Sequence, residues 1–234
     1  MQVLPAERTQ RTYARIAGFL YLFLIVTYMA GVLTLPVMTG SGDFAEIAGK
    51  IIASEQLYRI ALSSQLITSV GTVLLAFSLY QTLKPVNDDL ARMALYWRLG
   101  DAFVGGAGTI FSFTSLRLYT HPDYVGPFST EQLQALVYFT HDAHGVTLDV
   151  ASLFFTVGST LFFYLFFKSR YIPRLLSAFG IVASVLAFFM GFASLIYPEY
   201  ATTIQFGGYP ILIAEITTGF WLLCVGVRPQ TSVA

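Results

Sequence analysis

Two histidines and two aspartates lie close together in the stretch HDAHGVTLD, residues 141–149. Imidazole and carboxylate groups bind transition metals and exchange protons near neutral pH. If the stretch is helical, His141, Gly145, Asp149 and Ser152 share one face, and His144 lies one turn from His141. The spacing predicts a polar ridge along a helix, and Gly145 in its middle leaves room for a ligand or another backbone.

A zinc site is one hypothesis for this ridge. The chain has three histidines, His121, His141 and His144, and all three are predicted to lie on the same outer surface. Together with Asp142 or Asp149, they supply the ligand types that zinc prefers. The His-x2-His spacing does not define a metal site by itself. The sequence also contains no His-Glu-x-x-His, Gly-x-Ser-x-Gly, Walker-type or dinucleotide-binding motif.

The composition indicates which solvent surrounds these residues. Hydrophobic residues make up 56% of the 234 residues, aromatic residues 16% and charged residues only 11%. Such a chain is too apolar for one soluble core, and about 20 apolar residues in a row can cross a bilayer as a helix. We therefore expect an all-α polytopic membrane protein, a compact bundle of six transmembrane helices with short outer-surface helices, forming a single domain over residues 1–234. The predicted spans are 13–38, 57–83, 93–119, 145–167, 171–197 and 209–227.

The distribution of Lys and Arg predicts the orientation of the chain. With the N-terminus inside, the inner side carries Arg8, Arg11, Arg15, Lys84, Arg92, Arg98, Lys168, Arg170, Arg174 and Arg228. The outer side then carries Lys50, Arg59 and Arg117. Under the positive-inside rule, we expect both termini to face the cytoplasm in a multi-pass protein of the cell membrane. No basic patch indicates a nucleic-acid partner.

The outer connections are long enough to contain helices of their own. Ser129 and Gln132 have the spacing of a capping box, which predicts a helix that starts there and continues or bends into the fourth span. The turn KSRYIPR after that span is short, and Pro173 suits the first turn of the next helix. Cys224 is the single cysteine, so no disulfide can form within the chain.

Ionisable side chains inside the predicted spans are functional candidates, because a charge at the bilayer centre costs about 2.5–3.5 kcal/mol. Arg98 and Asp101 are three residues apart and can pair on one helix face. Glu215 has no charged neighbour in its own helix, so it should face the bundle interior and contact a polar group from another helix. Arg59, Arg117 and the His141 to Asp149 ridge are the expected partners. The candidate ligand or proton pocket consists of Arg59, Asp101, Arg117, His141, Asp142, Asp149 and Glu215.

Several segments, taken in order, also resemble a known family. They are ARIAGFLYLFLIV near the start, YRIALSSQLI, LYQTLKPVNDDLA, YWRLGDA, SLFFTVGSTLFFYLFFKSRYIPRLLSAFGIVAS and AEITTGFWLLCVGVR near the end. Their order and spacing resemble the bacterial membrane family known as domain of unknown function 4386, over nearly the whole chain. The resemblance implies a compact six-helix integral membrane protein, and it brings no established activity with it.

The sequence leaves three classes of function open. The first is a nonenzymatic membrane protein that binds or transports a small ligand, a lipid or a proton through an outward-facing polar pocket. The second is an intramembrane metal-dependent hydrolase with zinc at His121, His141 and His144. The third is an accessory or structural subunit of a membrane complex. The expected partners are the lipid bilayer, a small molecule or lipid, and, for the third class, another subunit or a second copy.

The charge asymmetry leads to a test of topology. An epitope tag fused to the C-terminus should be inaccessible to antibody in intact spheroplasts and become accessible after permeabilisation, because an even number of spans returns the chain to its starting side. A second tag inserted at Gly126, in an outer connection, should be accessible in intact spheroplasts. Labelling of the C-terminal tag without permeabilisation would contradict the predicted orientation.

Overall fold

The computed structural model describes residues 5–39, 44–121, 126–200 and 204–227, and every regular element among them is helical. Arg228, assigned above to the inner side, lies outside the described residues. The long helices are α1 (Pro5–Thr39), α3 (Glu55–Leu83), α4 (Asp88–Thr120), α6 (Thr130–Ser169), α7 (Arg174–Ile196) and α9 (Tyr209–Cys224). The shorter elements are α2 (Phe44–Ala53) and the 3-10 helices η1 (Pro198–Tyr200) and η2 (Gln205–Gly208). The all-α prediction is confirmed.

Five segments are long and apolar enough to cross a membrane: α1, α3, α6, α7 and Phe206–Cys224, which contains α9. A bilayer core offers no partners to backbone N–H and C=O groups, so apolar helices that satisfy these groups internally are suited to span it. The five helices make this a multi-pass membrane protein. The predicted third span, in α4, is not among the five segments. Its sequence carries Arg98, Asp101 and Arg117, which lower its mean hydropathy.

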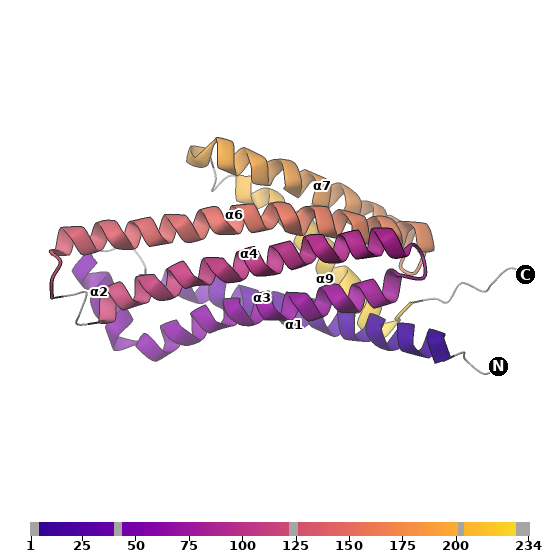
Figure 1. Ribbon diagram of the computed structural model, residues 1–234, viewed down its shortest axis with the longest axis horizontal. Helices are drawn as coiled ribbons and strands as arrows, with labels where there is room; N and C mark the ends of the chain where they lie inside the picture. The colour runs from indigo at the N-terminus through magenta and orange to yellow at the C-terminus, as the bar shows by residue number, and fades with distance from the viewer. Residues whose placement is uncertain (1–4, 40–43, 122–125, 201–203, 228–234) are drawn as a thin grey trace, which may run out of the picture.

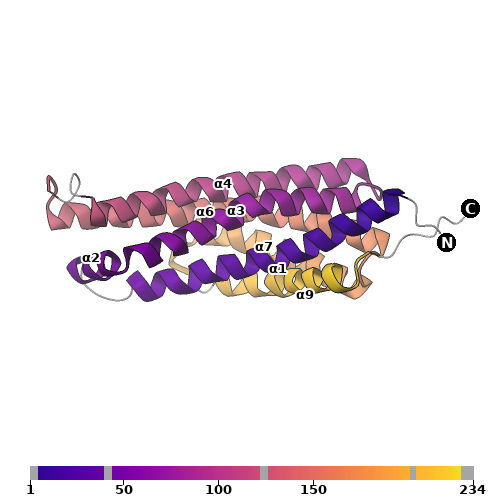
Figure 2. The ribbon, with the colours of Figure 1, turned by 90° about the horizontal axis from the view of Figure 1, so that it is seen from below.

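The six long helices form a closed ring. Each packs mainly against two neighbours, in the order α1, α3, α4, α6, α7, α9 and back to α1. Figures 1 and 2 show that all six run roughly along the long axis of the molecule, and that α7 and α9 are shorter than the other four. The short helix α2 contacts α1, α3, α4 and α6 at one end of the ring. The ring therefore encloses a central axis that side chains from all six helices can reach.

The two ends of the ring differ. The first turn of α1 and the last turn of α9 lie at the same end, together with the turns from α3 to α4 and from α6 to α7 (Figures 1 and 2). We call this the inner end, and the opposite end, which carries α2, the outer end. The arrangement agrees with a chain that begins and finishes on one side.

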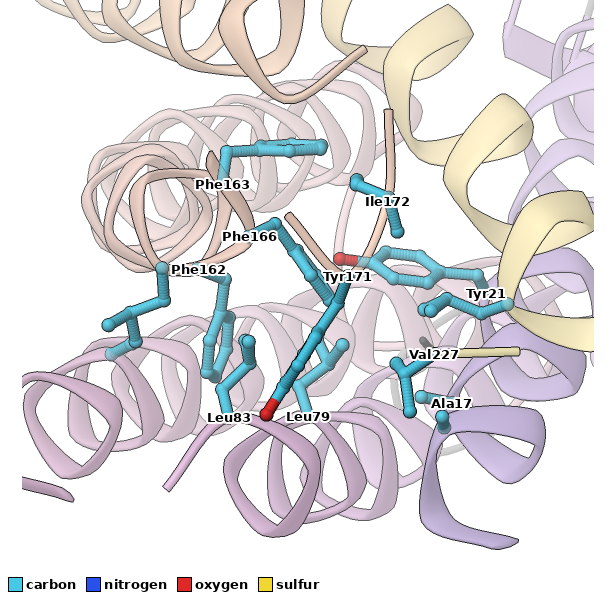
Figure 3. Close-up of a cluster of buried hydrophobic side chains, with 14 of the residues drawn as sticks. Ala17, Tyr21, Leu79, Leu83, Phe162, Phe163, Phe166, Tyr171, Ile172 and Val227 are labelled. Atoms are coloured by element: carbon cyan, nitrogen blue, oxygen red, sulfur yellow. The ribbon is translucent and has the colours of Figure 1, made fainter. Parts of the chain in front are cut away.

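An apolar core fills the inner end, and the connection between α6 and α7 contributes to it. Arg170 adopts a left-handed backbone conformation (φ 57°) at the end of α6 and reverses the chain. Tyr171 and Ile172 then enter the core, where they are 4% and 2% exposed. Figure 3 shows these two side chains among Ala17, Tyr21, Leu79, Leu83, Phe162, Phe163, Phe166 and Val227. The inner end of the axis is therefore closed by packed side chains.

Helix α6 extends well beyond the predicted fourth span. Its 40 residues correspond to about 60 Å, which is twice the ~30 Å of a hydrocarbon core. It starts at the predicted capping box, where Ser129 Oγ accepts from Gln132 N at 3.3 Å and Gln132 Oε1 accepts from Ser129 N at 2.9 Å. The outer part is held by a second core formed by Ile51, Tyr58, Leu62, Leu116, Leu118, Tyr119, Leu133 and Val137. The predicted range 145–167 is only the inner part of this helix.

Helices α1 and α9 approach most closely at Gly18. A Cβ atom at this position would lie 2.4 Å from Leu223 N and 2.7 Å from Gly219 O, both backbone atoms that cannot move independently. A Cβ at Gly219 would in turn lie 3.0 Å from the Cβ of Tyr21. The contact therefore depends on glycine, as in other membrane helix pairs whose backbones come close.

Replacing Gly18 by Ala should lower the thermal stability of the purified protein. The added methyl group must push α1 and α9 apart, and overpacking of this kind costs about 1–3 kcal/mol. Thermal unfolding followed by circular dichroism in detergent measures the effect. The matched control is Gly49→Ala on α2, where an added Cβ meets nothing within 4 Å. If Gly18→Ala and Gly49→Ala unfold at the same temperature, the close packing of α1 on α9 is wrong.

Candidate functional site

One guanidinium group and two carboxylates meet inside the ring. Arg98 on α4 is 3% exposed and Glu215 on α9 is 7% exposed. Arg98 Nη1 lies 3.6 Å from Asp101 Oδ2 and 3.9 Å from Glu215 Oε1. Both separations exceed the usual hydrogen-bond length, so the cation lies between the two acids rather than bonded to one. Since α4 and α9 are not neighbours in the ring, Arg98 reaches across the interior.

Ser159 on α6 connects the cation to one of the acids. Its hydroxyl accepts a hydrogen bond from Arg98 Nη1 at 3.4 Å and donates one to Glu215 Oε1 at 3.3 Å. Ser159 is 1% exposed. Arg98, Asp101, Ser159 and Glu215 are called the Arg98 cluster below. Three helices, α4, α6 and α9, contribute to it.

The surface of α6 is shaped to receive the Arg98 side chain. A Cβ at Gly158 would lie only 2.8 Å from Arg98 Cγ and 3.0 Å from Arg98 Cδ, so glycine leaves the space that the aliphatic stem fills. The ring of Phe155, one turn away, lies 4.5 Å from Arg98 Cζ and forms a cation–π contact. Arg98 Nε is buried and has no hydrogen-bond partner among the described residues. The guanidinium is thus held in place while part of its donor capacity is unused.

Helix geometry places the members of the Arg98 cluster at a similar level along the ring. At 1.5 Å per residue, Arg98 lies about 15 Å from the start of α4, and Ser159 about 15 Å from the end of α6. Glu215 lies about 14 Å from the end of α9 on the same basis. All three distances are measured from the inner end. The three side chains are therefore level with one another.

The members of the cluster differ in how open they are. The side chain of Asp101 is 20% exposed, whereas those of Arg98 and Glu215 are 4% and 9% exposed. Tyr21 of α1 is 2% exposed and faces the same interior, whereas Tyr28 on the same helix is exposed. Asp101 is the more open of the two acids.

The expected partners of Glu215 were wrong, although its interior position is confirmed. Arg59 forms an ion pair with Glu55 one turn away on α3, with Arg59 Nη2 2.6 Å from Glu55 Oε1. Arg117 is exposed near the outer end of α4. Neither side chain neutralises Glu215, because both lie toward the outer end of the ring and Glu215 lies near its middle. The predicted pairing of Arg98 with Asp101 is confirmed.

The ridge predicted from residues 141–149 does not form one continuous site. His141 and Asp142 are exposed. His144 turns toward α4, where its Nδ1 lies 3.0 Å from the carbonyl oxygen of Gly108. Asp149 Oδ2 instead accepts a hydrogen bond from Ser194 Oγ of α7 at 3.2 Å. The ridge therefore divides between two neighbouring helices.

The three histidines are not gathered into a ligand set. Within residues 5–39, 44–121, 126–200 and 204–227, no group of three or more His, Cys, Asp or Glu side chains is arranged to hold a metal ion. This applies to the predicted set of His121, His141 and His144 as well. The zinc hypothesis thus gains no support from the geometry.

A cavity lies near the outer end of the ring, between α1, α3, α4 and α6. Its volume is about 180 Å³. The lining residues are Leu35, Pro36, Tyr58, Leu62, Ser112, Ser115, Thr140, His141 and His144. We call it the outer cavity. A larger groove of about 590 Å³ between α1 and α3 is lined by exposed apolar side chains such as Phe19, Leu74 and Phe77, and it suits lipid chains rather than a polar solute.

Sequence reasoning missed the second contact of Arg98 and the whole contribution of Ser159. Counting residues from the helix ends would have indicated the contact between Arg98 and Glu215, because the two residues are nearly equidistant from the inner end. No sequence signal identified Ser159, since serine and threonine recur along the same helix. Only packing selects which of these hydroxyls enters the cluster.

Removing the charge of Arg98 should destabilise the protein more than removing the charge of Arg59. Arg98→Gln leaves the enclosed Glu215 and the more open Asp101 without their cation, and breaking a buried ion pair in this way costs about 3–5 kcal/mol. Arg59 belongs to an exposed pair, so Arg59→Gln should cost at most about 1 kcal/mol. Unfolding by denaturant in detergent measures both. The double variant Arg98→Gln with Glu215→Gln should recover part of the loss, and a double variant as unstable as Arg98→Gln would contradict the pairing.

The family described as Domain of unknown function (DUF4386) matches residues 16–226. No curated protein and no solved structure matches the chain significantly. The matched region includes all the residues of the Arg98 cluster and of the outer cavity. Because the match covers most of its length, the chain belongs to the DUF4386 family.

Proposed function

We propose that this protein is a six-span protein of the cell membrane that binds a proton at the Arg98 cluster and a small solute in the outer cavity. Its role is then proton-linked binding or transport of that solute, without a chemical reaction. Both termini face the cytoplasm in this proposal. No observation favours the alternatives of a metal-dependent hydrolase or an accessory subunit.

The charge count of the Arg98 cluster carries the proposal. Asp101 and Glu215 share one guanidinium, and no other cationic side chain of the described residues forms an ion pair with either acid. If both acids were ionised, one negative charge would remain uncompensated in the membrane interior, at a cost of several kcal/mol. A single bound proton removes this charge. The neutral cluster then contains the Arg98 cation, one carboxylate and one carboxylic acid, which titrate as a coupled pair.

The difference in exposure between the two acids supports a route in which the proton reaches the Arg98 cluster from the outer side. Asp101, the more exposed acid, lies on the outer side of Arg98 on α4. The inner end is closed by the apolar core around Phe162, Phe166 and Tyr171. Water can therefore approach Asp101 more readily from the outer half than from the inner half. Glu215 is the more enclosed of the two acids.

The packing of α4 supports its assignment as the sixth span. It packs against α3 and α6, and both of those helices qualify as membrane spans. The charged residue that most lowers its apolar character in the middle, Arg98, faces the interior rather than lipid. Six crossings also agree with the placement of the first turn of α1 and the last turn of α9 at one end.

The proton site can be tested by infrared spectroscopy of the protein in lipid nanodiscs. The wild type should show the carbonyl stretch of one protonated carboxyl group, and this band should disappear as the pH is raised. Both Asp101→Asn and Glu215→Gln should lack the titrating band, because Arg98 then compensates the single remaining acid. Glu55→Gln, in an exposed pair, is the matched control and should keep it. A titrating band that survives in both cluster variants would refute the proton site.

A further inference from the structure

We infer that the outer cavity binds a small aliphatic monocarboxylate together with one proton, which His144 holds. The inference rests on the proposed function in taking this cavity as the solute site. Its chemistry does not involve the Arg98 cluster, so the two proposals can fail separately.

The lining has an apolar side and a polar side that consists of hydroxyls and imidazoles. Leu35, Pro36 and Leu62 offer aliphatic contacts. The polar groups are Tyr58, Ser112, Ser115, Thr140, His141 and His144, and none of the lining residues is Asp or Glu. A site of this composition suits a molecule with a short hydrocarbon part and a group that accepts hydrogen bonds.

Three hydroxyl groups of the cavity have hydrogens to donate. Most other Ser and Thr hydroxyls of the spans donate to a carbonyl three or four residues earlier, and Thr140 does so to Val137 O at 2.9 Å. No hydrogen bond joins the hydroxyl of Tyr58, Ser112 or Ser115 to another described residue. A carboxylate is acceptor-only and can receive several such bonds at once.

His144 lines the cavity and has one ring nitrogen engaged with the backbone. Its Nδ1 is 3.0 Å from the Gly108 carbonyl oxygen, and a carbonyl can only accept, so Nδ1 carries a hydrogen. Nε2 is then the nitrogen left for a ligand, and it bears a lone pair while the ring is neutral. A carboxylate at Nε2 favours the protonated ring, because the N–H···O bond formed is charge-assisted. Binding therefore takes up one proton from solution.

The other titratable and charged groups near His144 do not replace it as the group that holds the proton. Among the lining residues, the other titratable groups are Tyr58 on α3 and His141 on α6, while α1 and α4 contribute none. Nearby acids are engaged or exposed: Glu55 pairs with Arg59, Glu46 on α2 pairs with Lys50, and Asp142 is exposed. Arg117 is also exposed on α4. The lining itself contains no Asp or Glu that would repel an anion.

The volume restricts the length of the ligand. A cavity of about 180 Å³ corresponds to roughly six water molecules at ~30 Å³ each. A carboxylate with about four carbons fits this space, whereas a long-chain fatty acid or a phospholipid headgroup exceeds it. Butanoate is therefore a suitable probe.

The experiment measures equilibrium binding of radiolabelled butanoate to the full-length protein in nanodiscs between about pH 6 and pH 8. The wild type should bind one butanoate per chain. Where a proton is taken up, the affinity should rise about tenfold for each unit by which the pH falls. Unlabelled 1-butanol and butylamine should not displace the probe. Displacement by either compound as effective as that by butanoate would overturn the carboxylate assignment, as would the absence of butanoate binding at every pH.

Variants locate the proton. His144→Gln should weaken butanoate binding at the low-pH end by about tenfold to a hundredfold, because a hydrogen bond to a charged group is lost, and it should abolish the pH dependence. The matched control is His121→Gln, since His121 does not line the cavity, and it should behave as the wild type. Unchanged binding in His144→Gln would overturn the inference. The infrared band of the Arg98 cluster should persist in this variant, which confirms its fold and separates the two proposals.

Discussion

A guanidinium group held between two carboxylates inside an apolar ring is the interaction on which the rest of this structure depends. A lone Arg98 at this depth would cost several kcal/mol, and so would a lone Glu215. Arg98 is compensated by both Asp101 and Glu215, and Glu215 is paired with a cation on a helix that is not its neighbour in the ring. The register of α4, α6 and α9 along the membrane normal is therefore tied to one cluster.

The ring differs on the two sides of the cluster. Toward the inner end, aromatic side chains of α6 pack on Tyr171 and Ile172 and fill the axis. Toward the outer end, α7 and α9 are shorter than their neighbours, and the outer half is held by a separate core beneath α2. The more exposed acid of the cluster, Asp101, lies on this outer side of Arg98. This asymmetry is what a protein needs if it takes up a proton or solute from one side only.

Glycine makes these close arrangements possible at a few positions. Gly158 leaves the space for the stem of Arg98, and Gly18 lets α1 reach α9. Without a hydrophobic driving force between helices in lipid, such close contacts and a small number of polar bonds supply much of the association energy. The same residues that stabilise the ring thus position the charged groups within it. Stability and the candidate chemistry are not separable at the centre of this protein.

The sequence by itself determined the solvent, the helices and their approximate ends, because apolar length and capping residues act locally. It predicted the start of α6 at Ser129, the Arg98–Asp101 pair and an interior Glu215. It did not identify which cation faces Glu215, since Arg59, Arg98 and Arg117 all satisfy the same local rules. It also treated residues 141–149 as one ridge, whereas His144 and Asp149 bond to different helices. Only the tertiary structure decided these contacts, because they depend on how far each helix is shifted along and rotated about its axis, and residues distant in the chain set both.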